Sequence, residues 1–284
     1  MLKILVTGAT GNVGREVIRL LLNQNCHVCA AVKNLDNAKQ ILGSNVHYIP
    51  FDFTNSNTWA SAFVGVNKLF LVRPPALANV RKDIAPALRA AKQAKVEQIV
   101  FLSILGADRN SFVPHSKIER YIEQLGIPAI FLRASFFMQN LNTVHREDIK
   151  TRGELFMPAG NGKTSFIDVR DIAAVAVRTL VEDGHSQGAY TLTGGEALTY
   201  YEVADIFTAV LGKPIRYINP SVLSFVAQMF ARRLPLSFVF IMAAIYTTAR
   251  LGLADSITLD VEQLLLRPPL TLRQYIEDYQ QFWQ

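Results

Sequence analysis

The first half of the chain alternates short apolar runs with segments whose apolar residues recur at helical spacing. Residues 2–7 (LKILVT) are almost wholly apolar, which is typical of a strand buried on both faces of a sheet. A helix is expected over 14–23, where the apolar residues share one face. The same alternation predicts strands at 27–32, 46–52, 68–72, 98–103 and 129–133, and helices at 36–42, 58–64, 80–94 and 116–126. Strands that alternate with helices over short connections indicate a parallel, doubly wound sheet.

The second half is less regular. A strand end leads into a helix over 166–183, and a strand follows at 189–194. The helix expected over 198–212 opens with Thr199 and Glu202 at the spacing of a capping box. We therefore expect less regular structure here than in the first half, and a smaller lobe beside the sheet.

Together these elements predict an α/β protein: a Rossmann-type doubly wound parallel sheet with a smaller C-terminal substrate lobe. The core is expected over 1–137, and 164–195 returns to it. The smaller lobe, expected to hold the substrate and cover it as a lid, takes 138–163 and 196–284. A chain of 284 residues is long enough for one large domain and a small second one.

One apolar segment of this lobe, 234–249, runs for sixteen residues without a charge. A helix needs about twenty apolar residues to cross a bilayer. Arg232, Arg233 and Arg250 also bracket the segment closely. We therefore expect a buried helix or a pocket lid rather than a transmembrane span, and attachment to a membrane surface stays open.

Composition argues against several classes of protein. The net charge is +6, but Lys and Arg are scattered rather than clustered as in nucleic-acid binders, so no nucleic-acid partner is expected. Cys26 and Cys29 form a CxxC, but CHVCAAV (26–32) is typical of a strand, on which residues three apart point to opposite faces. No second pair of cysteines completes a metal site, so none is expected. The chain begins with an apolar strand and no signal-peptide pattern, which predicts a cytoplasmic protein.

Residues 6–14 (VTGATGNVG) place three glycines between an expected strand and an expected helix. In a dinucleotide-binding loop, the first glycine allows a tight turn, the second lets backbone approach the pyrophosphate, and the third lets the helix pack closely on the sheet. The helix N-terminus adds free N–H groups for phosphate. The strand–turn–helix context favours a dinucleotide site over a plain turn. The candidate cofactor-binding residues of the loop are Gly8, Thr10, Gly11, Asn12, Val13 and Gly14.

The end of the second strand indicates which dinucleotide binds. An NAD site usually has Asp or Glu there to hold the ribose 2′-hydroxyl. This chain has Lys33, which cannot accept from a hydroxyl but can pair with a 2′-phosphate. Asp36, the only nearby acid, falls where it would cap the next helix. We therefore predict NADPH (NADP+) as the cofactor.

Asp52 and Phe53 follow the third strand, at the carboxyl edge of the sheet where ligands bind. Asp52 would accept a hydrogen bond from the adenine amine. Equally, it would make a turn before Thr54 and Asn55. From the residues alone both interpretations stay open.

Five short motifs occur in a characteristic order along the chain. They are TGATGNVG (7–14), DF (52–53), HSKIE (115–119), LRASFFMQNL (132–141) and FIDVRDIA (166–173). This series resembles the NmrA-like atypical short-chain dehydrogenase/reductase family, and is closest to its NAD(P)H:quinone reductase and triphenylmethane reductase type. The resemblance covers nearly the whole chain. It implies NADP(H) at the glycine loop, substrate between core and smaller lobe, and Arg73, Pro74 and Phe137 near the nicotinamide.

Typical members of this family have Tyr-x-x-x-Lys, with a glutamate four residues after the lysine. Aligned on Glu119, this chain has His115 in the lysine place and Ser111 in the tyrosine place. Aligned on Lys117, it has Val113 in the tyrosine place. Neither register supplies a tyrosine, and the histidine with its glutamate resembles the quinone reductase type.

The missing tyrosine bears on the substrate. A ketone reductase must protonate a developing alkoxide, whereas a quinone or a cationic dye spreads the added charge over a delocalised system. His115 would help as a hydrogen-bond donor or through an ordinary pKa near 6.5. Its other interpretation is structural, capping the helix or contacting the ribose. Ser103 either matches the family's catalytic serine or ends its strand.

We therefore expect an NADPH-dependent oxidoreductase that transfers hydride to a quinone-like or other soft apolar electrophile, with His115 as the candidate catalytic residue. The expected partner is a small apolar or aromatic substrate. The alternative is a non-catalytic NADP(H)-binding regulator that senses redox state and acts through protein partners. The missing tyrosine fits that alternative equally well.

Overall fold

A computed structural model describes residues 1–284, apart from the side chain of Ser237. The chain forms two compact units. The core unit comprises Met1–Ala134 and Val169–Leu192, and the second unit comprises Ser135–Asp168 and Thr193–Gln284. The chain first leaves the core unit after Ala134, three residues before the expected end of the core at 137.

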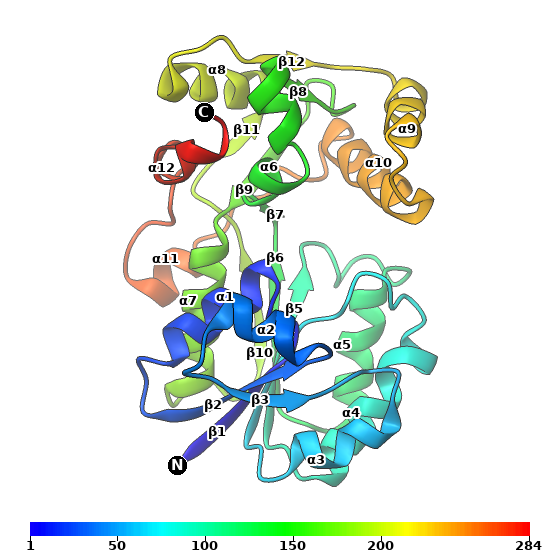
Figure 1. Cartoon of the computed structure of the whole chain (residues 1–284), viewed down its shortest axis with the longest axis vertical. Coiled ribbons are helices and arrows are strands. Elements are labelled where there is room, and N and C mark those ends of the chain that lie inside the picture. The colour runs from blue at the N-terminus through cyan, green and yellow to red at the C-terminus, as the bar shows by residue number, and fades with distance from the viewer. The chain divides into compact units, whose positions relative to one another are not determined.

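The core unit is built on a seven-stranded sheet in the order β10-β6-β5-β4-β1-β2-β3 (Figure 1). Every neighbouring pair in it is parallel, as predicted. The strands are β1 (Leu2–Val6), β2 (Cys26–Val32), β3 (His47–Pro50), β4 (Lys68–Leu71), β5 (Gln98–Ile104), β6 (Ala129–Ala134) and β10 (Gly188–Leu192). Strand order reverses at β1, because β2 and β3 lie to one side of it and β4 to β6 to the other. Ligands of such sheets bind at this switch point, outside the carboxyl ends of the strands.

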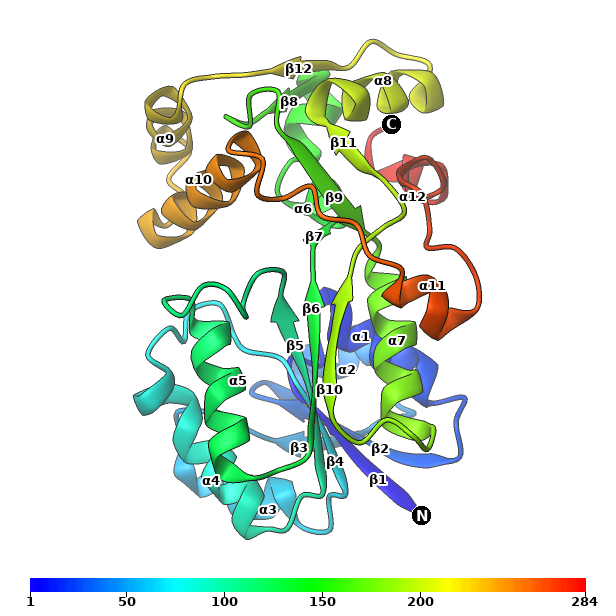
Figure 2. The ribbon, with the colours of Figure 1, turned by 180° about the vertical axis from the view of Figure 1, so that it is seen from behind.

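Helices cover both faces of the core sheet (Figure 2). On one face α3, α4 and α5 pack together over a buried apolar cluster, and on the other α1 packs against α7. The helices are α1 (Asn12–Leu21), α2 (Leu35–Leu42), α3 (Trp59–Phe63), α4 (Ala85–Gln93), α5 (Pro114–Leu125) and α7 (Val169–Val181). Rossmann-type α/β architecture is thus confirmed.

Two helix predictions need correction. The helix expected over 80–94 is π-helical over Val80–Ile84, and α4 begins only at Ala85. Pro86 accounts for the restart, since proline is tolerated in a first turn but not further inside a helix. Asp36 does not cap α2, because the side chain of Asn34 accepts the hydrogen bond from the N–H of Asn37 at 3.0 Å.

The second unit holds two small sheets, in the orders β11-β9-β7 and β12-β8. Their strands are β7 (Phe136–Phe137), β8 (Glu154–Phe156), β9 (Lys163–Ile167), β11 (Ala197–Thr199) and β12 (Arg216–Ile218). Its helices are α6 (Asn140–Thr143), α8 (Tyr200–Leu211), α9 (Val222–Ala231), α10 (Leu236–Arg250), α11 (Asp260–Leu265) and α12 (Leu272–Tyr279). Because β9 pairs with β7 and β11, residues 164–168 belong to this unit, and the return to the core begins at Val169 rather than at 164.

Aromatic side chains build the interior of the second unit, and Tyr200, Tyr246, Tyr275, Phe225 and Trp283 are fully buried there. The apolar segment expected as a buried helix or lid forms α10. Its inner face is buried, but its outer face leaves apolar side chains exposed: Leu236, Phe240, Ile241 and Ile245. None of the described helices is long and apolar enough to cross a membrane.

Candidate functional site

The glycine loop lies at the switch point of the core sheet, between the end of β1 and the start of α1. Gly8 has a φ of +60°, and a Cβ added there would lie 2.8 Å from the Cβ of Val72. Thr7 ties the loop to the end of β4, because its Oγ1 accepts from the N–H of Val72 at 2.8 Å and donates to the carbonyl of Phe70 at 3.1 Å. The loop and the segment after β4 therefore form one fixed edge.

Gly14 marks the close approach of α1 to this loop. A Cβ on Gly14 would lie 2.2 Å from the carbonyl oxygen of Gly8, so a larger residue would push the helix away. Gly11 differs, since a Cβ there would meet only that same oxygen at 3.2 Å. The third glycine serves packing, and the second keeps the outer surface of the loop bare.

The N-terminus of α1 has the features of a phosphate site. Gly11 is its N-cap with extended backbone, no side chain caps the helix, and its first turn carries no acid. Thr10 and Asn12 are half-buried beside it, whereas Val13 is buried, so Val13 can offer only its backbone N–H. Uncapped N–H groups and the positive end of the helix dipole together favour an anion.

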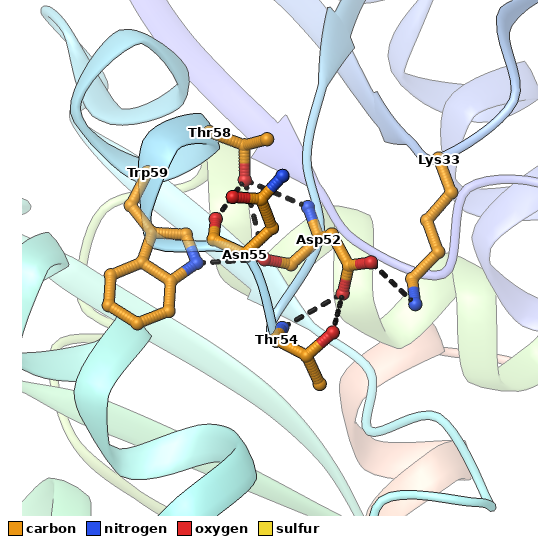
Figure 3. A network of polar contacts seen from close by, with 6 residues as sticks. All are labelled: Lys33, Asp52, Thr54, Asn55, Thr58 and Trp59. Carbon is orange, nitrogen blue, oxygen red and sulfur yellow. Dashed lines mark hydrogen bonds and ion pairs between the residues drawn. The ribbon is translucent and has the colours of Figure 1, made fainter.

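Lys33 and Asp52 meet where β2 and β3 end (Figure 3). The Nζ of Lys33 lies 2.9 Å from Oδ2 of Asp52, and the two side chains are 57% and 26% exposed. The other carboxylate oxygen, Oδ1, accepts from both the N–H and the hydroxyl of Thr54 at 2.8 Å. Partial burial alone would raise the pKa of Asp52, but the bonds from Thr54 and Lys33 outweigh it, so the pKa is lowered. Asp52 is thus both the turn residue and the partner of the lysine.

Phe53, the neighbour of Asp52, faces inward. It is 4% exposed and packs edge to face with Phe51, with ring centroids 4.8 Å apart. Its side chain belongs to the core of the unit, which leaves only its backbone for a ligand.

Arg73 follows β4, next to the glycine loop. Its Nη1 donates to the carbonyls of Pro74, Pro75 and Leu77 at 3.0–3.1 Å, so it folds the proline-rich segment around itself. Its Nε is buried and has no hydrogen-bond partner. Among the described residues no carboxylate pairs with this guanidinium, and burial lowers its pKa.

The hydroxyl of Ser103 is engaged inside the protein. Ser103 lies on β5 beside Arg133 of β6, and its hydroxyl donates to Oε1 of Glu119 at 2.5 Å. Arg133 binds the same carboxylate through Nη2 at 2.7 Å and Nε at 3.2 Å. Glu119 is 4% exposed, so this is a buried network that fixes α5 on the sheet. Arg133 is therefore the base that pairs with Glu119.

His115 lies in the first turn of α5, one turn before Glu119. Its ring stacks on Phe101 of β5 at 5.9 Å, and its Nδ1 is buried without a partner. Burial, with the positive charge of Arg73 as a second cause, lowers the pKa of His115 to about 4. The expectation of an ordinary pKa near 6.5 was therefore wrong. His115 is neutral at neutral pH.

Phe137 lies in the second unit, on β7, paired with Ile167 of β9. The same unit has a small hollow that the sequence did not reveal, lined by Phe136, Asn140, Val144, Phe238, Ile241, Met242, Ile245 and Tyr246. Under it, His145 is buried and hydrogen-bonded to the hydroxyl of Tyr246. Only the aromatic spacing of α10 could have hinted at this hollow.

The structure thus gathers the glycine loop, Arg73 and Pro74 at one edge of the core sheet, with Lys33 and Asp52 paired at the ends of the two strands beyond β1. His115 lies at the start of α5, and the positive charge of Arg73 is one of the two causes that lower its pKa. Ser103 and Phe53 are held by internal contacts instead.

Known proteins resemble this chain over nearly its whole length. The chain is 33% identical over 276 residues to the NAD(P)H azoreductase of Xenophilus azovorans, covering 96% of both chains. The structure of the Citrobacter sp. triphenylmethane reductase complexed with NADP(H) matches with a TM-score of 0.88 at 26% identity, covering 97% of this chain and 99% of that one. The NADPH complex of quinone oxidoreductase 2 from Escherichia coli matches with a TM-score of 0.88 at 27% identity, with coverage of 97% and 99%.

A family model also matches almost the whole chain. The model of the NmrA-like family matches residues 2–274, which include the glycine loop, Lys33, Asp52 and His115. The chain therefore belongs to the NmrA-like family.

Proposed function

We propose that this protein is an NADPH-dependent reductase that transfers hydride to a quinone-like or other soft apolar electrophile. The observation that carries the proposal is the glycine loop at the switch point of a parallel sheet, leading into a helix whose N-terminus is uncapped. The names of the relatives support it, since they include an NAD(P)H azoreductase, a triphenylmethane reductase and an NADPH-dependent quinone oxidoreductase.

The residues of the loop fit NADP(H). The N–H groups at the start of α1 would hold the pyrophosphate, and the bare surface at Gly11 would let it approach the backbone. Lys33, at the end of β2, would hold the 2′-phosphate. NADPH, when bound, would supply the hydride, which is the chemistry of the cofactor rather than of the protein.

His115 then acts as a neutral hydrogen-bonding group and not as an acid. A neutral imidazole carries one N–H and one acceptor, so it can orient an oxygen or nitrogen of the substrate without giving up a proton. The uncompensated charge of Arg73 favours negative charge nearby. A substrate that spreads the added charge over a conjugated system suits such a site, because its proton can come later from water.

The second unit would supply apolar surroundings for a flat substrate. Its hollow is lined mainly by apolar and aromatic side chains, with Asn140 as a polar exception. Phe238→Ala should therefore raise the KM for the electrophile while it leaves NADPH affinity unchanged.

The test uses purified protein, NADPH, and a panel of quinones, azo dyes and cationic triphenylmethane dyes, with absorbance followed at the nicotinamide band. NADPH affinity is measured separately by calorimetry. Turnover of at least one class supports the proposal. Tight NADPH binding with no turnover of any acceptor favours the regulator instead, and absence of NADPH binding overturns both.

His115→Ala tests the role of the histidine, with Lys117→Ala as the control. Lys117 is exposed on the same helix, two residues on. His115→Ala should lower kcat, whereas the control should not. Full turnover in His115→Ala would remove the histidine from the reaction.

A further inference from the structure

The charge of Lys33 is already engaged in the structure. Its ammonium lies 2.9 Å from the Asp52 carboxylate, at the place where a 2′-phosphate is expected to bind (Figure 3). A phosphate that binds Lys33 must therefore share it with Asp52 or draw it away.

Asp52 is the fixed member of this pair. Two bonds from Thr54 hold its carboxylate, and its backbone is held on both sides. Its N–H donates to the hydroxyl of Thr58 at 3.0 Å, and its carbonyl accepts from the indole N–H of Trp59 at 2.8 Å (Figure 3). Lys33 instead reaches Asp52 with a long, flexible and mostly exposed side chain. The Lys33 side chain can therefore move toward a ligand, whereas the Asp52 carboxylate is held in place.

We propose that Asp52 sets the margin by which the protein prefers NADPH over NADH, by competing with the 2′-phosphate for Lys33. The inference rests on the proposed function. NADH carries a hydroxyl at that position, so its binding leaves the ion pair intact. NADPH places its 2′-phosphate beside Lys33 and therefore close to the fixed negative charge of Asp52, which disfavours its binding. The preference for NADPH is therefore smaller than Lys33 alone would give.

If Asp52 instead contacts the adenine, a different effect on the two cofactor affinities is predicted. A carboxylate has about four acceptor positions, and Thr54 and Lys33 use three of them. A bond from the adenine amine to the remaining position would strengthen NADH and NADPH equally, because both contain adenine. Competition for Lys33 changes only the ratio of the two affinities.

The experiment measures the dissociation constants of NADPH and NADH by calorimetry for four proteins: the wild type, Asp52→Asn, Lys33→Met and the double variant. The quantity compared is the NADH constant divided by the NADPH constant. Asp52→Asn should raise this ratio by about two- to fivefold, the factor that an exposed ion pair typically contributes. Lys33→Met should bring the ratio close to one. In the Lys33→Met background, Asp52→Asn should raise the ratio by less than it does in the wild type.

Glu182→Gln is the matched control. It removes another partly exposed ion pair, with Arg178 at 2.7 Å near the end of α7, and should leave the ratio unchanged. The inference is overturned if Asp52→Asn weakens both cofactors by one factor, leaves the ratio unchanged, or raises it equally with and without Lys33. A wild type that binds neither dinucleotide overturns the proposed function as well, so the two failures are distinct.

Discussion

A glycine is needed at positions 14 and 11 for different reasons. Replacing each with alanine should therefore separate an effect on folding from an effect on cofactor binding. In Gly14→Ala the new Cβ would meet three backbone atoms, the closest 2.2 Å away and the others at 2.8 and 3.0 Å. Backbone atoms cannot rotate away as a side chain can, so α1 and the loop must separate by about 1 Å to restore contact distance. In Gly11→Ala the single contact at 3.2 Å needs only a few tenths of an ångström.

The magnitudes follow from these contacts. Overpacking costs about 1–3 kcal/mol, and a backbone clash at 2.2 Å falls in the upper part of that range, at about 2–3 kcal/mol. Alanine returns about 1 kcal/mol as a better helix former than glycine. The free energy of unfolding of Gly14→Ala should therefore drop by about 1–2 kcal/mol, which lowers the Tm by about 2–8 °C for a unit of this size. Gly11 has φ −80° and ψ 171°, which alanine adopts freely, so its Tm should hold within about 1 °C.

Calorimetric unfolding without cofactor and NADPH titration are the two assays. Gly14→Ala should lose both stability and affinity. Gly11→Ala should keep its Tm and lose NADPH affinity by about tenfold or more, because its methyl group occupies the surface where the pyrophosphate would approach. Gly195→Ala, whose Cβ would meet only an ordinary contact at 3.6 Å, is the control and should change neither. Equal losses of Tm in Gly11→Ala and Gly14→Ala, or an unchanged Gly14→Ala, would refute the reasoning.

Three further predictions concern buried ionisable side chains. Glu119→Gln should lower the free energy of unfolding in urea by about 3 kcal/mol, because it leaves Arg133 without its buried partner; Glu277→Gln, in an exposed pair, should cost less than about 1 kcal/mol. Stability should fall as the pH is lowered from 6.5 to 4: the pKa of His115 and of His145 is about 4 in the fold, mainly because of burial, so the unfolded chain binds more protons in this window. A flat stability profile there would contradict these assignments. Turnover should show no histidine titration between pH 6 and 8, and a rate inflection near 6.5 that disappears in His115→Asn would count against a neutral His115.

The sequence predicted those parts of the fold that are encoded locally. A buried strand, a glycine turn and an amphipathic helix follow one another within 21 residues, and each leaves its own periodicity. The capping box of Thr199 and Glu202 was likewise predicted from a spacing of three, and it is present. Features of this kind need no knowledge of what lies across the sheet.

The site chemistry depended on contacts between residues far apart in the chain, and local patterns do not predict such contacts. Lys33 and Asp52 are 19 residues apart, and their pairing follows only once β2 and β3 are known to be neighbours. Ser103 lies near a strand end, but its hydroxyl donates to Glu119, 16 residues further along the chain. The pKa of His115 depended on its burial against Phe101, which periodicity does not report.

The network of Ser103, Glu119 and Arg133 also limits how this protein can change over evolutionary time. A single substitution that removes Glu119 leaves Arg133 with only the more distant Asp108, at 3.7 Å. One that removes Arg133 leaves a buried carboxylate without its base. Either intermediate is a poor starting point for a second mutation. The three positions should therefore be exchanged together among descendants of this chain.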